Sequence, residues 1–204
     1  MKKKNHKKRY KRVSKRKKRG EYSLIKSKPI NLRRLMVALV LWLLIMSAIL
    51  SFFFSVTRIR GYSMIPNFRD KDIVLLNKNK PVKRFDVVKS DVGREQLAFF
   101  RVIGLPGDKV EYKNDNLFIN DEQIDEKYLV DAINDAHKNG GIYTEDFTNQ
   151  WLGDSPVVPL DSYLLLGDNR ENVNDSRFYG YISADQIKGV ITYRLLPFNR
   201  GQHF

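Results

Sequence analysis

The sequence predicts a mainly β domain of antiparallel strands that follows one N-terminal transmembrane helix. Three observations support this fold class. Residues 35–56 form one long apolar run, and the short apolar runs beyond it are separated by Gly, Pro, Asn and Asp. The chain shows neither an internal repeat nor an alternation of strands with helices, so a parallel sheet is not expected.

The apolar run comes first along the chain. Residues 35–56 contain no Asp, Glu, Lys, Arg, His, Pro or Gly, and about 20 residues suffice to span a bilayer as a helix. A cleaved secretory signal would have a shorter apolar core, and no small-x-small cleavage site follows before Arg58. A soluble helix would show a polar face, but only three serines interrupt the run. The sequence therefore predicts an uncleaved anchor.

The net charge of +14 is concentrated in the tail, residues 1–34. This low-complexity segment holds 17 of the 37 basic and one of the 23 acidic residues, so it carries +16 and the rest of the chain −2. The positive-inside rule predicts a cytoplasmic tail and an extracytoplasmic domain, residues 57–204, held at the cell membrane. The tail suits anionic lipid headgroups, at about 1 kcal/mol per basic residue. RNA binding by the tail is the weaker alternative, and no nucleic-acid partner is expected.

The outer domain is predicted as strands and turns. The predicted strands are residues 73–76, 85–88, 97–103, 110–112, 117–119, 163–166 and 189–195. Gly93 and residues 114–116 mark two hairpin turns, and residues 105–108 form a turn in which Pro fixes φ. Residues 128–159 are polar and predict a variable excursion with one short helix near 130–137. The chain contains no cysteine, so disulfides and thiolate metal sites are excluded, and no metal or other cofactor is expected.

Ser63 is the first candidate for chemistry. It lies in the segment G-Y-S-M-I-P, residues 61–66, shortly after the predicted anchor. A serine hydroxyl becomes a nucleophile only when a neighbouring base takes its proton. Taken alone, the segment favours a simple turn serine over a nucleophile. Three further segments change this reading, namely D-I-V-L-L-N-K at 72–78, R-V-I-G-L-P-G-D at 101–108 and G-D-N-R-E-N-V-N-D-S-R at 167–177.

Together and in this order, these segments resemble the type I signal peptidases over nearly the whole outer domain. The resemblance implies a mostly β membrane endopeptidase with a Ser/Lys dyad. It also implies that the C-terminal part of a signal peptide binds as an extended strand, with small side chains in shallow apolar pockets. Ser63 matches the nucleophile, and its backbone N–H would help bind the oxyanion. Gly61, Met64 and Pro66 match the oxyanion and substrate groove.

The resemblance also implies a supporting frame around the site. Ion pairs and hydrogen bonds would hold the last signature segment beside the serine. The matching residues are Arg101, Asp108, Asp168, Arg170, Asp175, Ser176 and Arg177.

Two departures affect the dyad itself. The family's lysine immediately precedes the arginine of the second signature, where this chain has Phe100. Val173 stands where the family has the serine that orients this lysine. The two changes together predict an apolar patch in place of a polar pair, because losing one member alone would leave an unpaired polar group. Asn67 also replaces the usual threonine after the proline.

A substitute base is a weaker hypothesis. Lys89 lies on the strand that precedes Phe100, and a hairpin could bring it near Ser63, although its register matches an apolar family position. The three histidines, His6, His137 and His203, fall in the tail, the excursion and the C-terminus, where surface roles are expected.

Three functional hypotheses follow. The first is a membrane endopeptidase acting on signal peptides of exported preproteins, with impaired cleavage because the base is absent. The second is a non-cleaving homologue that binds an exported protein and assists surface assembly, for example of a pilus-like fibre. The third is a LexA-type autoprotease, which the membrane anchor argues against. One anchor and a compact outer domain favour a Gram-positive-like member.

Overall fold

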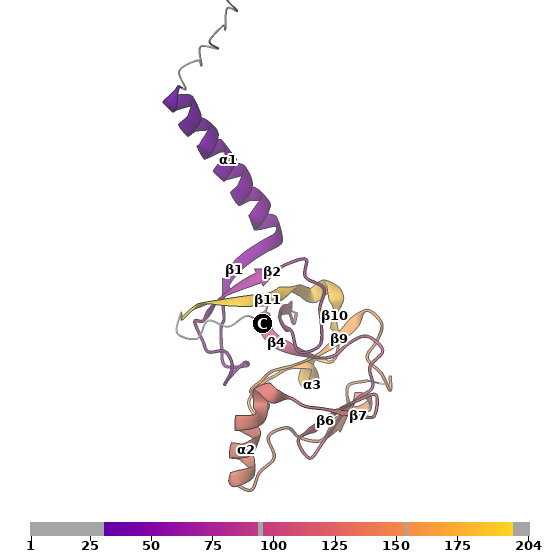
Figure 1. Cartoon of the computed structure of the whole chain (residues 1–204). Coiled ribbons are helices and arrows are strands. Elements are labelled where there is room, and N and C mark those ends of the chain that lie inside the picture. The colour runs from indigo at the N-terminus through magenta and orange to yellow at the C-terminus, as the bar shows by residue number, and fades with distance from the viewer. Residues whose placement is uncertain (1–30, 94–95, 154, 198–204) are drawn as a thin grey trace, which may run out of the picture. The chain divides into compact units, whose positions relative to one another are not determined.

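The computed structural model describes residues 31–93, 96–153 and 155–197 of the 204. These residues form a long N-terminal helix, two antiparallel sheets and several short helices (Figure 1). The mainly β fold class is confirmed. Most of the predicted basic tail, residues 1–34, lies outside the described residues.

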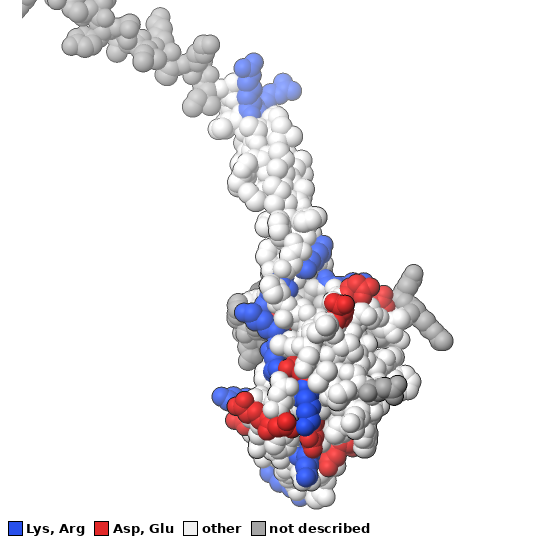
Figure 2. All heavy atoms as spheres, turned by 90° about the vertical axis from the view of Figure 1, so that its right-hand side faces the viewer, with Lys and Arg blue, Asp and Glu red and all other residues white. Residues whose placement is uncertain are grey.

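The first helix, α1, spans Leu32–Phe53 and is long and apolar enough to cross a membrane. Figure 2 shows it as a white column with basic side chains only near its first turn. The predicted span, residues 35–56, is shifted by three residues at each end. The backbone N–H of Leu35 already donates to the carbonyl of Asn31, so helical hydrogen bonding begins earlier than the uncharged run.

The helix also ends earlier than predicted because the next residues belong to a strand. Strand β1, Phe54–Arg58, pairs with β2, Ile73–Asn77, in an antiparallel register from Phe54↔Asn77 to Arg58↔Ile73. Its β-branched Val56 and Thr57 suit a strand. Hydropathy alone could not separate the two elements, because β1 begins with apolar residues.

The larger sheet has the strand order β1-β2-β11-β3-β4-β9-β10, and all its pairs are antiparallel. Its remaining strands are β3 (Val87–Asp91), β4 (Leu97–Gly104), β9 (Ser162–Leu166), β10 (Ile182–Ser183) and β11 (Ile187–Leu196). The strand predicted at residues 85–88 starts later than expected. Phe85 has a positive φ of 66°, and the carboxylate of Asp86 accepts from the N–H of Lys83, so both residues belong to a turn.

The smaller sheet lies away from β1 and β2 in the folded domain (Figure 1). Its order is β7-β6-β5-β8, with β5 at Val110–Lys113, β6 at Asn116–Ile119, β7 at Glu122–Ile124 and β8 at Phe147–Thr148. The predicted excursion, residues 128–159, contains the expected helix, α2, at Val130–Lys138. It also supplies β8, which sequence reasoning missed, because a two-residue strand has no periodic signal.

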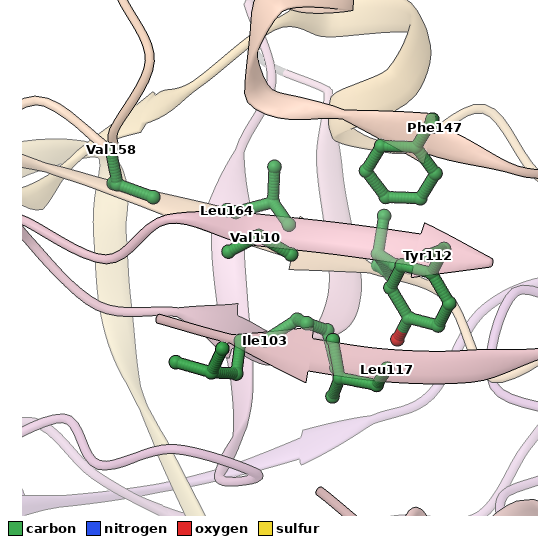
Figure 3. Packing of buried hydrophobic residues seen from close by; sticks show 9 residues of the cluster. Ile103, Val110, Tyr112, Leu117, Phe147, Val158 and Leu164 are labelled. Carbon is green, nitrogen blue, oxygen red and sulfur yellow. The ribbon is translucent and has the colours of Figure 1, made fainter. Parts of the chain in front are cut away.

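Short helical turns complete the structure. They are η1 (Lys127–Leu129), η2 (Asn149–Trp151), α3 (Ser176–Tyr179) and η3 (Ala184–Gln186). The core consists of three apolar clusters. The first cluster packs the small sheet against β4 and β9. Figure 3 shows Tyr112 beside Phe147 in this cluster, and their ring centroids are 5.0 Å apart. The other two contain Phe99 and Phe100, respectively.

Candidate functional site

Ser63 lies on the loop between β1 and β2, and buried anchors fix this loop. Ile59 joins its two ends, because its N–H donates to Asp72 and its carbonyl accepts from Lys71. Met64 and Phe68 are buried in the cluster that contains Phe99, and the N–H of Phe68 donates to the carbonyl of Met64. The side chain of Met64, next to Ser63 in sequence, is therefore buried in the core, whereas Ser63 is half-buried at the surface.

The other predicted loop residues have more limited contacts. Gly61 adopts a positive φ of 84°, which favours glycine, and its N–H donates to Asp70. Pro66 follows a cis peptide bond and is exposed.

Three segments that are distant in sequence meet at Ser63. Its hydroxyl donates to the carbonyl oxygen of Phe99 on β4, at 3.0 Å, and its own carbonyl accepts from the N–H of Asn169. Gly167 lies so close that an added Cβ would be 2.7 Å from the Ser63 carbonyl and 2.8 Å from a Val173 methyl carbon. The serine loop, β4 and the segment 167–173 thus meet at one place.

The position beside this serine is apolar. Phe100 is 2% exposed and packs in a cluster with Val88, Val102 and Leu165. Val173 packs against the same cluster. The Ser63 hydroxyl therefore has a carbonyl as its partner, and no titratable side chain among the described residues hydrogen-bonds to it. A main-chain carbonyl cannot act as a general base.

Lys89 lies on the other face of the sheet. It pairs directly with Phe99, whereas Val88 pairs with Phe100, and directly paired side chains share a face while neighbours along a strand alternate. Its ammonium donates to the Thr57 hydroxyl at 3.1 Å and lies 5.9 Å from the centroid of the Phe99 ring. Partial burial, and then the charge of Arg60, lower the pKa of the Lys89 amine. Despite this shift, Lys89 does not face the place where Phe100 replaces the lysine.

A buried ion pair supports the site from behind. Arg101 and Asp168 form a bidentate pair, with Nε–Oδ1 at 2.8 Å and Nη2–Oδ2 at 2.6 Å. Burial alone would lower the pKa of Arg101, but the charge of Asp168 more than offsets this and raises it. Asn67 donates to the same carboxylate at 2.9 Å and to the carbonyl of Tyr128. The residue that departs from the family pattern thus ties the serine loop to the frame.

A second buried pair lies further back. The guanidinium of Arg170 donates to Glu126, with Nη2–Oε1 at 2.6 Å, and to the hydroxyls of Tyr112 and Thr144. Both charged side chains are almost fully buried. Sequence reasoning included Arg170 but missed Glu126, because Glu126 belongs to none of the signature segments.

The last predicted supporting residues hold the signature segment at 167–177. Asp175 accepts from the N–H of Gly167 and from Nε of Arg177, and the Ser176 hydroxyl accepts from the N–H of Leu165. Asp108 is different, because it caps its own turn through Leu105 and pairs with Arg84 at 2.9 Å.

A groove opens between two strand edges, and one of its lining residues is Phe99, whose carbonyl accepts from the Ser63 hydroxyl. β1 pairs only with β2, and β9 covers β4 only from Arg101 onward, so residues 97–100 of β4 pair on one side only within the described chain. Between these edges lies a hollow of about 390 Å³. It is lined by Thr57, Arg58, Arg60, Lys89, Gln96, Leu97 and Phe99. The lining is strongly basic, whereas the resemblance implied shallow apolar pockets.

The remaining candidates contribute nothing to this site. His137 pairs with Asp115 at 2.8 Å in the excursion, and His6 and His203 lie outside the described residues. Across residues 31–93, 96–153 and 155–197, no group of three or more His, Asp or Glu side chains could hold a metal ion.

The described chain thus combines one apolar helix with a mainly antiparallel β domain that carries Ser63 on its first loop. The family described as signal peptidase, peptidase S26, matches residues 32–196. The chain therefore belongs to this family.

Similar proteins agree with this assignment. Signal peptidase IB of Staphylococcus aureus (strain Mu50 / ATCC 700699) is 40% identical over 153 residues, which cover 71% of this chain and 79% of that protein. Signal peptidase I of Bacillus caldolyticus is 35% identical over 156 residues, covering 73% and 83%. The crystal structure of a signal peptidase I from Enterococcus faecalis V583 is 40% identical, with a TM-score of 0.52, and the match covers 55% of this chain and 98% of that one.

Proposed function

We propose that this protein is a membrane-anchored signal peptidase homologue that binds the C-terminal segment of signal peptides and cleaves them poorly. One observation carries this proposal. The Ser63 hydroxyl donates to the Phe99 carbonyl, and the base position beside it is filled by Phe100 within an apolar cluster. Without a general base, cleavage is expected to fall by about 10²–10⁴-fold. The folded serine loop and its frame keep the groove in place for binding.

The proposed topology follows from the charge distribution. The basic tail lies in the cytoplasm and contacts anionic lipid headgroups, helix α1 crosses the cell membrane, and the domain that follows it faces outward. External protease on intact protoplasts should degrade epitopes beyond Thr57 and spare those before Arg34. Protection of the outer domain would contradict this topology.

Cleavage of a preprotein by the full-length protein in detergent tests the proposal. The wild type and Ser63→Ala should be equally inactive. Phe100→Lys alone should recover little, because Val173 cannot orient the new amine. Phe100→Lys combined with Val173→Ser should recover more than either single change, since residues in contact couple non-additively. Adding Ser63→Ala to that double variant is the control and should abolish the recovered activity.

A wild type that cleaves as fast as the Phe100→Lys, Val173→Ser double variant, at a rate that Ser63→Ala abolishes, would contradict impaired cleavage. In that case Lys89→Ala becomes the deciding variant, because Lys89 is the remaining candidate base. If no cleavage occurs but peptide binds, the alternative proposal applies: a homologue that retains an exported protein without cutting it and assists its assembly at the surface, as in a pilus-like fibre. The apolar cluster that contains Phe100, and against which Val173 packs, favours this alternative over an efficient peptidase.

A further inference from the structure

The groove that Phe99 lines carries three cations, and the proposed function considered one of them, Lys89, only as a substitute base. Arg58 and Arg60 line it from β1 and the loop that follows, and Lys89 lines it from β3. Among the described residues, no carboxylate lies within 4.0 Å of any of these three side chains, although nine other ion pairs form. Their positive charge is therefore not neutralised inside the described part of the protein.

The surroundings of these cations strengthen their effect on a ligand. Lys89 is half-buried, and its only hydrogen-bond partner in the described chain is the neutral hydroxyl of Thr57. Arg60 is near enough to oppose the protonation of Lys89. A bound anion would relieve this repulsion and replace the water lost from the amine, because an opposite charge stabilises the protonated form.

The shape of the groove fits an extended chain. It lies between β1 and the first residues of β4, whose outer edges are not covered by other strands of the described chain. A peptide can add to such an edge as a further strand, with main-chain hydrogen bonds for affinity and side-chain pockets for specificity. The Ser63 hydroxyl bonds to the carbonyl of Phe99, which also lines the groove, so such a strand would pass beside the serine.

We infer that this groove selects an extended peptide that directs an Asp or Glu side chain at Lys89, Arg58 and Arg60, in place of the small apolar side chain that the resemblance implies. The inference rests on the proposed function and specifies its substrate class. An anionic lipid headgroup would also satisfy the three cations. It would make no use of the two strand edges or of the apolar walls formed by Leu97 and Phe99, and so the peptide is favoured.

Fluorescence anisotropy on the full-length protein in neutral detergent tests this inference. Two labelled peptides share an Ala-x-Ala core, and in one of them the first alanine is replaced by Asp. The wild type should bind the Asp peptide about five- to tenfold more tightly, as expected for one partly desolvated charge pair. Lys89→Gln should remove this preference, because it weakens binding of the Asp peptide by about five- to tenfold. Lys113→Gln, on the far end of β5, is the matched control and should change neither affinity.

Reversing the charge of Lys89 is a stricter test of the same inference. Lys89→Glu should weaken the Asp peptide and strengthen a peptide with Lys at the same position. Equal binding of both original peptides by the wild type would overturn the inference and leave the proposed function intact. Failure to bind either peptide would overturn both. Short-chain phosphatidylglycerol serves as the lipid probe. If its binding depends on Lys89 while peptide binding does not, the groove is a headgroup site, and the inference is wrong.

Discussion

Two sets of charged side chains differ in how their charge is matched. In the first set, Arg101 with Asp168 and Arg170 with Glu126 are buried, and both guanidinium groups are held by carboxylates at hydrogen-bonding distance. In the second set, the groove cations Arg58, Arg60 and Lys89 are exposed or half-buried and have no carboxylate partner in the described chain. The first set serves the fold and the second is available to a ligand. Variants in the two sets should therefore fail in different assays.

The largest effect is expected for the deepest pair. Glu126→Ala leaves the guanidinium of Arg170 buried without its carboxylate, and breaking one side of a buried pair costs about 3–5 kcal/mol. We expect the free energy of unfolding of the full-length protein in detergent, measured by urea denaturation, to fall by about this amount. A loss below about 1 kcal/mol would mean that this frame is not held by its charges.

A smaller effect is expected where the frame meets the serine loop. Asn67→Ala removes the hydrogen bond to the charged Asp168 and the one to the Tyr128 carbonyl. Hydrogen bonds to charged groups are worth about 1.5–3 kcal/mol each, and we expect a loss of stability in this range. Asn67→Thr, which restores the usual family residue, is the comparison. If Asn67→Ala is as stable as the wild type, the loop is fixed by Met64 and Phe68 alone.

The groove cations should contribute almost nothing to stability. Arg60→Gln changes an exposed side chain that forms no ion pair in the described structure, and such surface substitutions usually lie within about 0.5 kcal/mol. Urea denaturation should therefore show an unchanged midpoint, while binding of the Asp peptide weakens. A large loss of stability would remove the distinction between the two sets.

The sequence predicted the local parts of this arrangement well. The hairpin at β5 and β6 follows from Asn114 and Asp115, both of which adopt positive φ. Helix α2, at Val130–Lys138, lies where a short helix near residues 130–137 was predicted. The frame was predicted only where signature residues marked it. Glu126 lies far from Arg170 in sequence, so only tertiary packing shows that the two are partners.

Register limited the rest of the prediction. Placing Lys89 on the strand beside Phe100 was correct, but whether it faced the site depended on a shift of one residue. A slip of one residue moves every side chain of a strand to the opposite face. The basic groove was missed for a similar reason, because Arg58 and Arg60 on one edge meet Lys89 only when the sheet is folded.

The smallest expected effect concerns the pKa of the Lys89 amine, which reports on the unmatched charge of the groove. Burial, and then Arg60, lower the pKa of its amine, and the other groove groups near it are Arg58 and the Thr57 hydroxyl. Acetic anhydride reacts only with the neutral amine. Lys89 should therefore be acetylated at lower pH in the folded protein than in a denatured sample, as measured by mass spectrometry.

Arg60→Gln and binding of the Asp peptide should both raise the pKa of Lys89, for different reasons. Arg60→Gln removes a repelling charge, so the pKa of Lys89 should rise toward its ordinary value without reaching it, because burial remains. The Asp peptide adds an attracting charge and should raise the pKa in the wild type, whereas the alanine peptide should not. If Arg60→Gln leaves the pKa of Lys89 unchanged, the charge of Arg60 does not act on the Lys89 amine. If the Asp peptide binds without raising the pKa, its carboxylate lies elsewhere, and the unmatched charge of the groove is not what recognises it.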